Sequence, residues 1–127
     1  MLRFPVLLLA VAAVPVRAQG VDPALTGATW HVVEIEGVRP PNPQTLQFGD
    51  QRVTGQGPCN RFAAGFKQTG QSIEIGQPVA TRMFCQARME AEKRYFDALH
   101  AVRGYALEDS TLSLNAADGH TLVKLTK

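Results

Sequence analysis

The sequence has little of what marks several large classes of protein. Among 127 residues there are only two cysteines and one tryptophan, and 13 Lys and Arg are nearly balanced by 11 Asp and Glu. Such balance argues against a nucleic-acid-binding protein, because that binding depends on a basic surface. Beyond the first 18 residues, no segment is apolar enough to span a membrane. The length predicts one domain.

The first 18 residues show the order of features of a secretory signal peptide. A short basic start, Met1-Leu2-Arg3, is followed by an apolar run from Phe4 to Val14 that is too short to cross a bilayer, and then by Val16-Arg17-Ala18. A buried N-terminal strand or helix fits this order less well. We expect cleavage after Ala18, a domain at residues 19–127 and a periplasmic or secreted location. Since Gln19 rather than cysteine follows, we expect no lipid anchor.

The two cysteines, Cys59 and Cys85, favour a structural disulfide. Exported proteins fold in an oxidising compartment, where such bonds persist. The loop-entropy model gives this cross-link a stabilisation of about 3 to 4 kcal/mol. The alternatives are two buried free thiols or a redox pair, although a redox pair is usually spaced Cys-x-x-Cys.

Short alternating and β-branched segments predict about eight strands. They are drawn from residues 29–36, 45–48, 51–54, 63–67, 72–75, 79–82, 105–107, 111–114 and 121–125. The last three of these segments form a meander separated by turn-forming residues. The stretch from Gly55 to Pro58 predicts an irregular turn, and residues 19–28 predict an irregular connection.

Only the segment from about Ala87 to Val102 has the periodicity of an amphipathic helix. Its apolar side carries Met89, Tyr95, Phe96, Leu99 and Val102. Gly104 is expected to end the helix, and no good N-cap precedes it. The combination predicts an α+β domain, in which a curved, mostly antiparallel, half-barrel-like sheet carries one packed helix.

Glu92 lies on the apolar side of this helix, between Phe96 and Leu99 in angle. A carboxylate there must reach solvent, a cation or backbone donors. Arg88, one turn earlier, is the local cation, and Arg61 and Arg82 are the distant ones. We expect a polar network of Asn60, Arg61 and Glu92 beneath the disulfide, and Glu92→Ala should leave a buried arginine unpaired.

The sequence resembles the META domain, the fold of the HslJ-type heat-shock proteins, over nearly all of residues 19–127. The resemblance rests on Leu25-x-Gly27-x-x-Trp30, Gly55-x-Gly57-x-Cys59-Asn60-Arg61-Phe62, Thr81-Arg82-Met83-x-Cys85 and Met89-x-x-Glu92. Pro58 departs from the glycine common in the family. The resemblance implies a sheet wrapped partly around a helix, a motif set that includes Thr81 and Arg82, and links to the cell envelope, heat shock and novobiocin resistance. Some related folds look similar to pilot proteins that bind a lipidated or amphipathic partner. The family has no assigned catalytic residues.

No catalytic or metal-binding pattern stands out from the residues themselves. There is no Gly-x-Ser-x-Gly, and the histidines His31, His100 and His120 are scattered, so we expect no cofactor and no metal. The Gly55-Gln56-Gly57 stretch lacks the Gly-Lys-Ser/Thr that a phosphate-binding loop needs. Cys59 could act as a nucleophile only as a free thiol. A thiol-dependent enzyme or small hydrolase is therefore the weakest hypothesis.

We expect a monomeric, non-enzymatic protein that supports envelope integrity or the stress response by binding another protein. The alternative is a carrier, or pilot-like binder, of a lipid, an acyl chain or an amphipathic peptide held between sheet and helix. Such a space would be lined by Phe48, Phe66, Met89, Phe96 and Leu99. The same side chains could instead form the hydrophobic core that a small domain needs.

Overall fold

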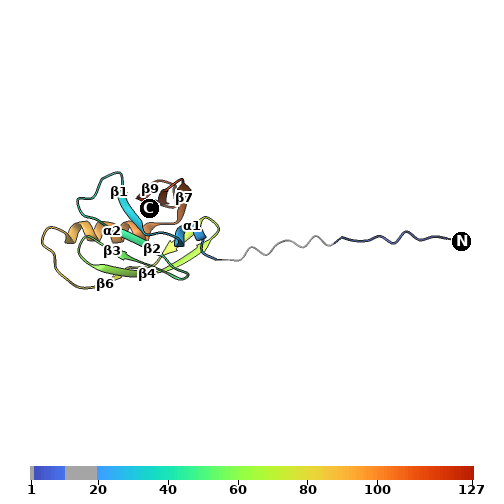
Figure 1. The fold of residues 1–127 in the computed structure, drawn as a ribbon, viewed down its shortest axis with the longest axis horizontal. Coiled ribbons are helices and arrows are strands. Elements are labelled where there is room, and N and C mark those ends of the chain that lie inside the picture. The colour runs from blue at the N-terminus through green and yellow to red at the C-terminus, as the bar shows by residue number, and fades with distance from the viewer. Residues whose placement is uncertain (1, 11–19) are drawn as a thin grey trace.

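A computed structural model describes residues 2–10 and 20–127 (Figure 1). Residues 2–10 contain no helix or strand. The expected cleavage point after Ala18 lies outside the described residues. No described helix is long and apolar enough to cross a membrane.

The described chain forms nine strands and two helices, which confirms the α+β class. In chain order the elements are α1 (Pro23–Thr26), β1 (Trp30–Ile35), β2 (Thr45–Phe48), β3 (Arg52–Gln56), β4 (Arg61–Thr69), β5 (Ser72–Ile75), β6 (Val79–Ala80), α2 (Met89–Ala101), β7 (Gly104–Glu108), β8 (Thr111–Asn115) and β9 (Thr121–Thr126). The segments expected at 45–48 and 72–75 have the observed bounds.

The strands form one antiparallel sheet in the order β3-β2-β1-β9-β8-β7-β5-β4-β6. The sheet returns on itself because β3 pairs with β4 as well as with β2, so the curved sheet expected from the sequence has a ring-like arrangement. The seam between β5 and β7 is narrow, with only Ser72 and Gly104 in register. Helix α2 packs against β1, β5 and β9 (Figure 1).

Strand alternation places one apolar face of the sheet toward helix α2. In β2, β5 and β8 every second residue is buried, and these side chains join Tyr95 and Leu99 of the helix in one core. Trp30 is fully buried, and its indole N–H donates to the carbonyl oxygen of Leu25 at 3.0 Å. The space between sheet and helix is therefore filled by side chains.

The connection expected at residues 19–28 contains a one-turn helix, α1. Asp22 is its N-cap, because the carboxylate accepts a hydrogen bond from the N–H of Ala24 at 2.9 Å, and Pro23 occupies the first turn. The same aspartate holds the turn against the sheet, since it accepts a hydrogen bond from the hydroxyl of Tyr105 at 2.9 Å.

The irregular turn expected from Gly55 is shorter than predicted. Strand β3 continues through Gly55 and Gln56, which pair with Phe62 and Arg61 of β4. A Cβ on Gly55 would lie 2.2 Å from the carbonyl oxygen of Thr45, so glycine permits a close backbone approach here rather than a turn. The turn itself comprises residues 57–60.

Gly104 does not end helix α2 as expected. The helix ends at Ala101, and the backbone of Val102 is already extended with φ −64° and ψ 135°. Val102 is fully buried. Gly104 is instead the first residue of β7.

Candidate functional site

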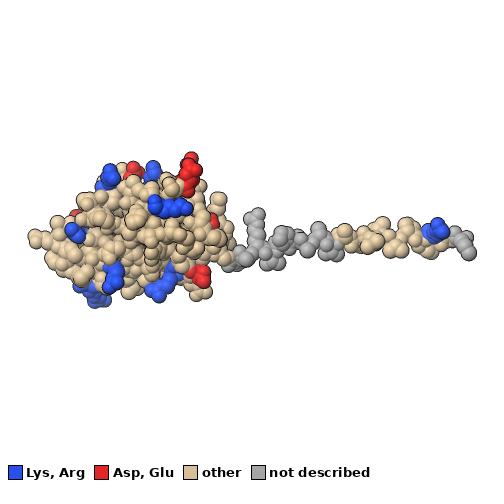
Figure 2. All heavy atoms as spheres, in the orientation of Figure 1, with Lys and Arg blue, Asp and Glu red and all other residues tan. Residues whose placement is uncertain are grey.

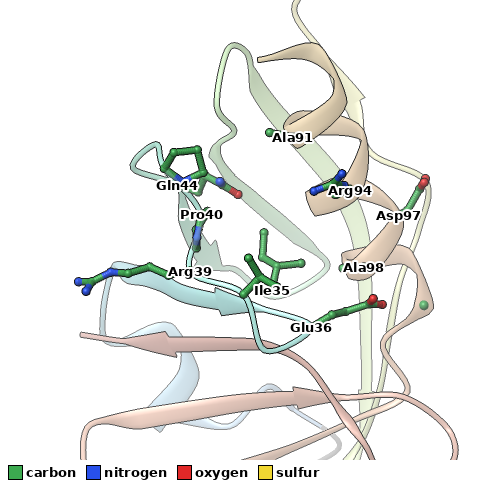
Figure 3. Close-up of a pocket in the computed structure, with 12 residues that line it drawn as sticks. Ile35, Glu36, Arg39, Pro40, Gln44, Ala91, Arg94, Asp97 and Ala98 are labelled. Atoms are coloured by element: carbon green, nitrogen blue, oxygen red, sulfur yellow. The ribbon is translucent and has the colours of Figure 1, made fainter. Parts of the chain in front are cut away.

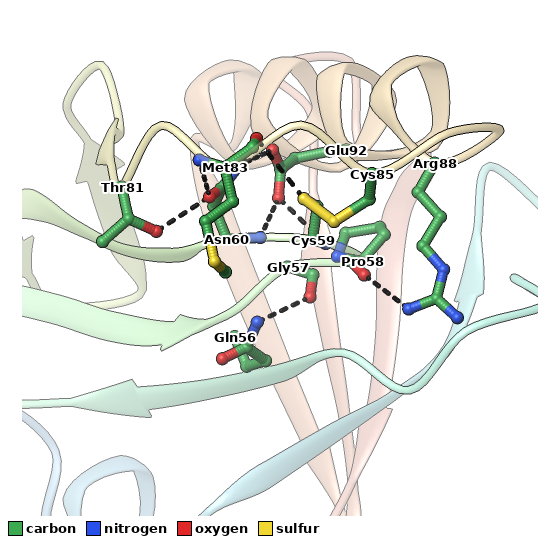
Figure 4. The surroundings of a disulfide bond; sticks show 10 residues. All are labelled: Gln56, Gly57, Pro58, Cys59, Asn60, Thr81, Met83, Cys85, Arg88 and Glu92. Carbon is green, nitrogen blue, oxygen red and sulfur yellow. Dashed lines mark hydrogen bonds between the residues drawn. A yellow bond between two sulfur atoms is a disulfide. The ribbon is translucent and has the colours of Figure 1, made fainter.

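The β3–β4 turn, residues 57–60, meets the loop that precedes helix α2, residues 81–88 (Figure 4). A disulfide between Cys59 and Cys85 joins them, with a Cα–Cα distance of 5.8 Å, so the expected pairing is confirmed. Neither cysteine is a free thiol. The cross-link ties a turn of the sheet to the start of the helix.

Glu92 is buried beneath this cross-link, with 5% of its surface exposed. Its Oε1 accepts hydrogen bonds from the backbone N–H groups of Cys59 at 3.1 Å and Asn60 at 2.6 Å. Its Oε2 accepts a third from Nδ2 of Asn60 at 2.8 Å. The carboxylate therefore sits at the β3–β4 turn, where it is satisfied by three amide donors (Figure 4).

Asn60 connects this carboxylate to loop 81–88. Its Nδ2 donates to Glu92 and to the carbonyl oxygen of Met83 at 3.1 Å. Its Oδ1 accepts from the N–H of Met83 and from the hydroxyl of Thr81, both at 2.8 Å. A side-chain amide offers two donors and an acceptor with two lone pairs, and all of them are used. Asn60 thus fixes the backbone of the loop at Met83.

The expected arginine partner of Glu92 is replaced by these amides. Arg61 and Arg82 are exposed, and the Arg88 side chain donates to the carbonyl oxygen of Pro58 at 3.3 Å. Throughout the described residues, no arginine side chain forms a hydrogen bond or ion pair with Glu92. Of the expected polar set, the structure brings together Asn60, Thr81 and Glu92 and leaves Arg61 and Arg82 at the surface.

Loop 81–88 carries large apolar side chains into solvent. Phe84 is 81% exposed and Met83 is 58% exposed, and nearby Val79 in β6 is 76% exposed. The extremity formed by this loop is uncharged in Figure 2, and Lys and Arg side chains lie beside it. In the sequence, Met83 stands out only as part of a motif. The sequence feature that could have indicated this exposed surface is the apolar pair Met83-Phe84 directly before Cys85, in a segment with no helix or strand pattern.

Comparison with family models matches the META domain over residues 23–127. The chain belongs to the META domain family. A comparison with curated proteins finds no match.

Solved structures share the fold of this META domain. A DUF4847 family protein from Bacteroides vulgatus superposes with a TM-score of 0.64 at 16% identity, covering 84% of this chain and 96% of the other. A protein from Burkholderia xenovorans, solved by NMR, gives 0.61 at 20% identity, with coverage of 99% and 97%. At these identities the likeness concerns the fold alone.

The residues expected to line a ligand space are mostly part of the core of the META domain. Phe48, Phe66 and Leu99 are buried, and Phe96 is half-buried with its ring 5.0 Å from that of Phe62. Met89 is 37% exposed at the start of α2. Phe66 also borders a hollow of about 630 Å³ beside His100 and Arg103.

A separate cleft of about 470 Å³ lies between helix α2 and segment 36–44, which connects β1 to β2 (Figure 3). None of the five expected lining residues borders it. Its walls are formed by Ile35, Glu36, Val38, Arg39, Pro40, Pro41, Gln44, Ala91, Arg94, Asp97, Ala98 and Ala101. The small side chains at Ala91 and Ala98, two helical turns apart, leave the space open.

Among residues 2–10 and 20–127 there is no group of three or more His, Cys, Asp or Glu that could hold a metal ion. The chemical groups around the disulfide are a satisfied carboxylate, a satisfied amide and an oxidised sulfur pair. Such groups can hold backbone segments in place and present side chains to a partner.

Proposed function

We propose that this META domain is an exported, non-enzymatic protein that supports envelope integrity or the stress response by binding another protein through loop 81–88. One observation carries the proposal. Phe84 and Met83 are exposed on a loop whose backbone is held by a disulfide and by the Asn60 amide. Aromatic and methionine side chains are enriched in protein interfaces.

The fixed loop supports binding because little freedom remains to be lost. Ordering a flexible loop and its side chains on association weakens affinity. Here the disulfide holds Cys85, and Asn60 holds the backbone N–H and carbonyl groups of Met83. Phe84 lies between these two points of attachment, so its backbone is already ordered.

The charges near the loop indicate the chemistry of the partner. Arg61 directly follows turn 57–60, and Arg82 and Arg88 lie in loop 81–88, whereas neither segment contains an acidic residue. The first acidic residue after the loop, Glu90, forms an ion pair with Arg94 at 3.2 Å. A partner with an apolar depression and an acidic rim would complement this surface.

The disulfide also supports the proposed location. Such bonds form and persist in oxidising compartments such as the bacterial periplasm. The signal-peptide features of residues 1–18 are consistent with export to that location.

Carriage of a lipid or acyl chain between sheet and helix has less support, because Phe48, Phe66 and Leu99 pack inside the core. Protein binding at loop 81–88 is therefore the stronger candidate.

The test places a photo-cross-linking amino acid at position 84 in cells that export the protein. Any partner captured is then purified and its affinity measured against wild type, Phe84→Ser and a control, Ala106→Ser, which alters an exposed apolar residue of β7 outside this loop. We expect Phe84→Ser to weaken binding at least about tenfold and Ala106→Ser to leave it unchanged.

Two results would overturn protein binding as the function. One is equal affinity of wild type and Phe84→Ser for the captured protein. The other is that no specific protein is captured, while wild type binds anionic phospholipid vesicles and Phe84→Ser does not. That outcome would assign the loop to a membrane surface.

A further inference from the structure

The cleft between helix α2 and segment 36–44 shares no residue with loop 81–88. Its volume of about 470 Å³ falls within the range of small-ligand sites, which are largely apolar with a few polar groups. Ile35, Pro40 and Ala98 supply apolar wall. The stripe of alanines on α2 only explains why there is room; it does not by itself indicate a ligand.

The indication of a ligand comes from Gln44, which is 98% buried at this cleft. Its Nε2 donates to the carbonyl oxygen of Asn42 at 3.4 Å, and this contact places Oε1 on the opposite side of the amide. That oxygen is the one buried side-chain polar atom of the described residues that has no hydrogen-bond partner. In Figure 3 it points from the loop toward helix α2.

A buried acceptor without a donor destabilises a protein, so its presence calls for an explanation. An apolar side chain such as methionine could occupy much the same volume without that cost. The presence of glutamine at position 44 is explained if a bound molecule supplies the missing N–H or O–H donor.

The charges around the cleft have both signs. Glu36 and Arg39 line the loop side and form no ion pair within the described part of the chain. On the helix side, Arg94 pairs with Glu90 at 3.2 Å and Asp97 pairs with Lys93 at 2.6 Å. A mixed rim does not select a ligand of a single charge sign, such as a nucleotide or an anionic lipid.

We propose that this cleft binds a short, extended peptide segment. A rotation of the Gln44 side chain opens Oε1 to the cleft, one backbone N–H of the peptide donates to it, and one apolar side chain packs between Pro40 and Ala98. An extended peptide carries a donor in every non-proline residue, whereas an acyl chain has none to offer Gln44. Glu36 and Arg39 then face charged or polar groups that flank the apolar side chain.

The test uses the whole folded protein and a defined probe, the blocked peptide acetyl-Ala-Leu-Ala-N-methylamide. Its addition should shift the NMR signals of the Gln44 side-chain amide and of the Ala91 and Ala98 methyl groups. Ester analogues that replace one peptide N–H at a time should include one that binds about tenfold more weakly, since it lacks the donor for Gln44.

Gln44→Met separates a binding role of Gln44 from a structural one, because the two roles predict changes in Tm of opposite sign. A structural role predicts a lower Tm, and a binding role predicts a higher one. We expect Gln44→Met to raise the Tm, since an unpartnered acceptor is removed, and to weaken peptide binding at least about tenfold. Gln71→Met, an exposed glutamine outside the cleft, should change neither. Ala91→Leu, which fills the cleft from the helix side, should also weaken binding and provides a second variant should Gln44→Met fold poorly.

The proposal fails if the peptide leaves the cleft signals unchanged up to solubility, or if Gln44→Met and Ala91→Leu bind it as wild type does. It also fails if sodium octanoate shifts these signals and the peptide does not, because the site would then accept acyl chains. Phe84→Ser should bind the probe normally, so loss of the proposed partner contact and loss of this site can be told apart.

Discussion

At the scale of single residues, Glu92 and Asn60 have the largest consequences. The carboxylate of Glu92 binds two backbone N–H groups of the β3–β4 turn, and the amide of Asn60 holds the loop on its other side. Three segments distant in sequence therefore depend on two side chains. Satisfied buried polar networks hold such segments in one arrangement, and removal of one partner leaves the others without hydrogen bonds.

We predict that Glu92→Ala lowers the free energy of unfolding by about 3 kcal/mol, because it leaves buried amide donors unsatisfied. Glu92→Gln should cost less, since its carbonyl oxygen can still accept from the turn. Glu90→Ala is the matched control on the exposed side of α2 and should change stability by less than about 0.5 kcal/mol. Urea unfolding measures all three, and equal losses for positions 90 and 92 would contradict the network.

Tyr95 connects residue chemistry to pH. Burial raises the pKa of its hydroxyl, which donates to the carbonyl oxygen of Thr45 at 2.9 Å. Since the folded-state pKa lies above the unfolded value of about 10, the contribution of the neutral hydroxyl is complete below that pH and is lost as the pH rises above it.

Wild type should therefore lose stability faster than Tyr95→Phe above about pH 10, with a difference in slope approaching 1.4 kcal/mol per pH unit. Urea unfolding between about pH 9 and 11.5, without reductant, measures this slope. Tyr105→Phe is a milder comparison, because partial burial and the hydrogen bond to Asp22 also raise the pKa of Tyr105. If the free energy of unfolding depends on pH in the same way for wild type and Tyr95→Phe, the pKa of Tyr95 does not differ between the folded and unfolded states, and the prediction is wrong.

At the scale of elements, the β2–β3–β4 region shows how a glycine can be misread. In sequence, Gly55 next to Gly57-Pro58 predicts a turn. In the structure, Gly55 is inside β3, where the backbone of Thr45 and the ring of Phe62 approach too closely for a Cβ. The local sequence shows that residue 55 is glycine, but it does not show why a side chain is excluded there. The reason is the backbone of Thr45, which β2 places against Gly55.

Gly55→Ala should accordingly destabilise the protein by about 3 kcal/mol or prevent folding, since a Cβ would meet Thr45 at 2.2 Å and Phe62 at 2.9 Å. Gly65 in β4 is the matched control, because a Cβ added there would meet no atom within 4 Å beyond its chain neighbours. Gly65→Ala should change stability by no more than about 0.5 kcal/mol. Chemical unfolding of both variants measures the difference, and equal tolerance at the two positions would decide against the close approach.

At the scale of the whole molecule, closure of the sheet makes the two ends of the domain interdependent. Strand β9, near the C-terminus, pairs with β1 and with β8, and its residues Leu122, Val123 and Leu125 are buried. Because β3 also pairs with β4, the first and last strands cannot separate without opening the ring. We therefore expect the domain to unfold in one cooperative step.

Leu125→Ala should lower the free energy of unfolding by about 2 to 5 kcal/mol, and fluorescence of the buried Trp30 should report the same transition as far-UV circular dichroism. Lys124→Ala, exposed in the same strand, should have little effect. Two separated transitions would show that the N-terminal and C-terminal strands unfold independently.

Local patterns were enough to determine the fold class, most strand positions, the single long helix and the position of Glu92 on its apolar side. These features depend on side-chain periodicity, which neighbouring residues alone express. The two cysteines favoured a disulfide, since only one internal pairing existed, and the structure decided between that bond and the alternatives of free thiols or a redox pair. The motif also pointed to Asn60, which the structure places in hydrogen bonds with Glu92.

Only the tertiary structure decided what each of these residues contacts. It paired Glu92 with amides instead of an arginine, placed Phe48, Phe66 and Leu99 in the core, and opened a cleft at Gln44 and Ala98. Each outcome depends on which distant segment closes against a given side chain. That choice is made by packing of the whole ring of strands around α2, which no local pattern specifies.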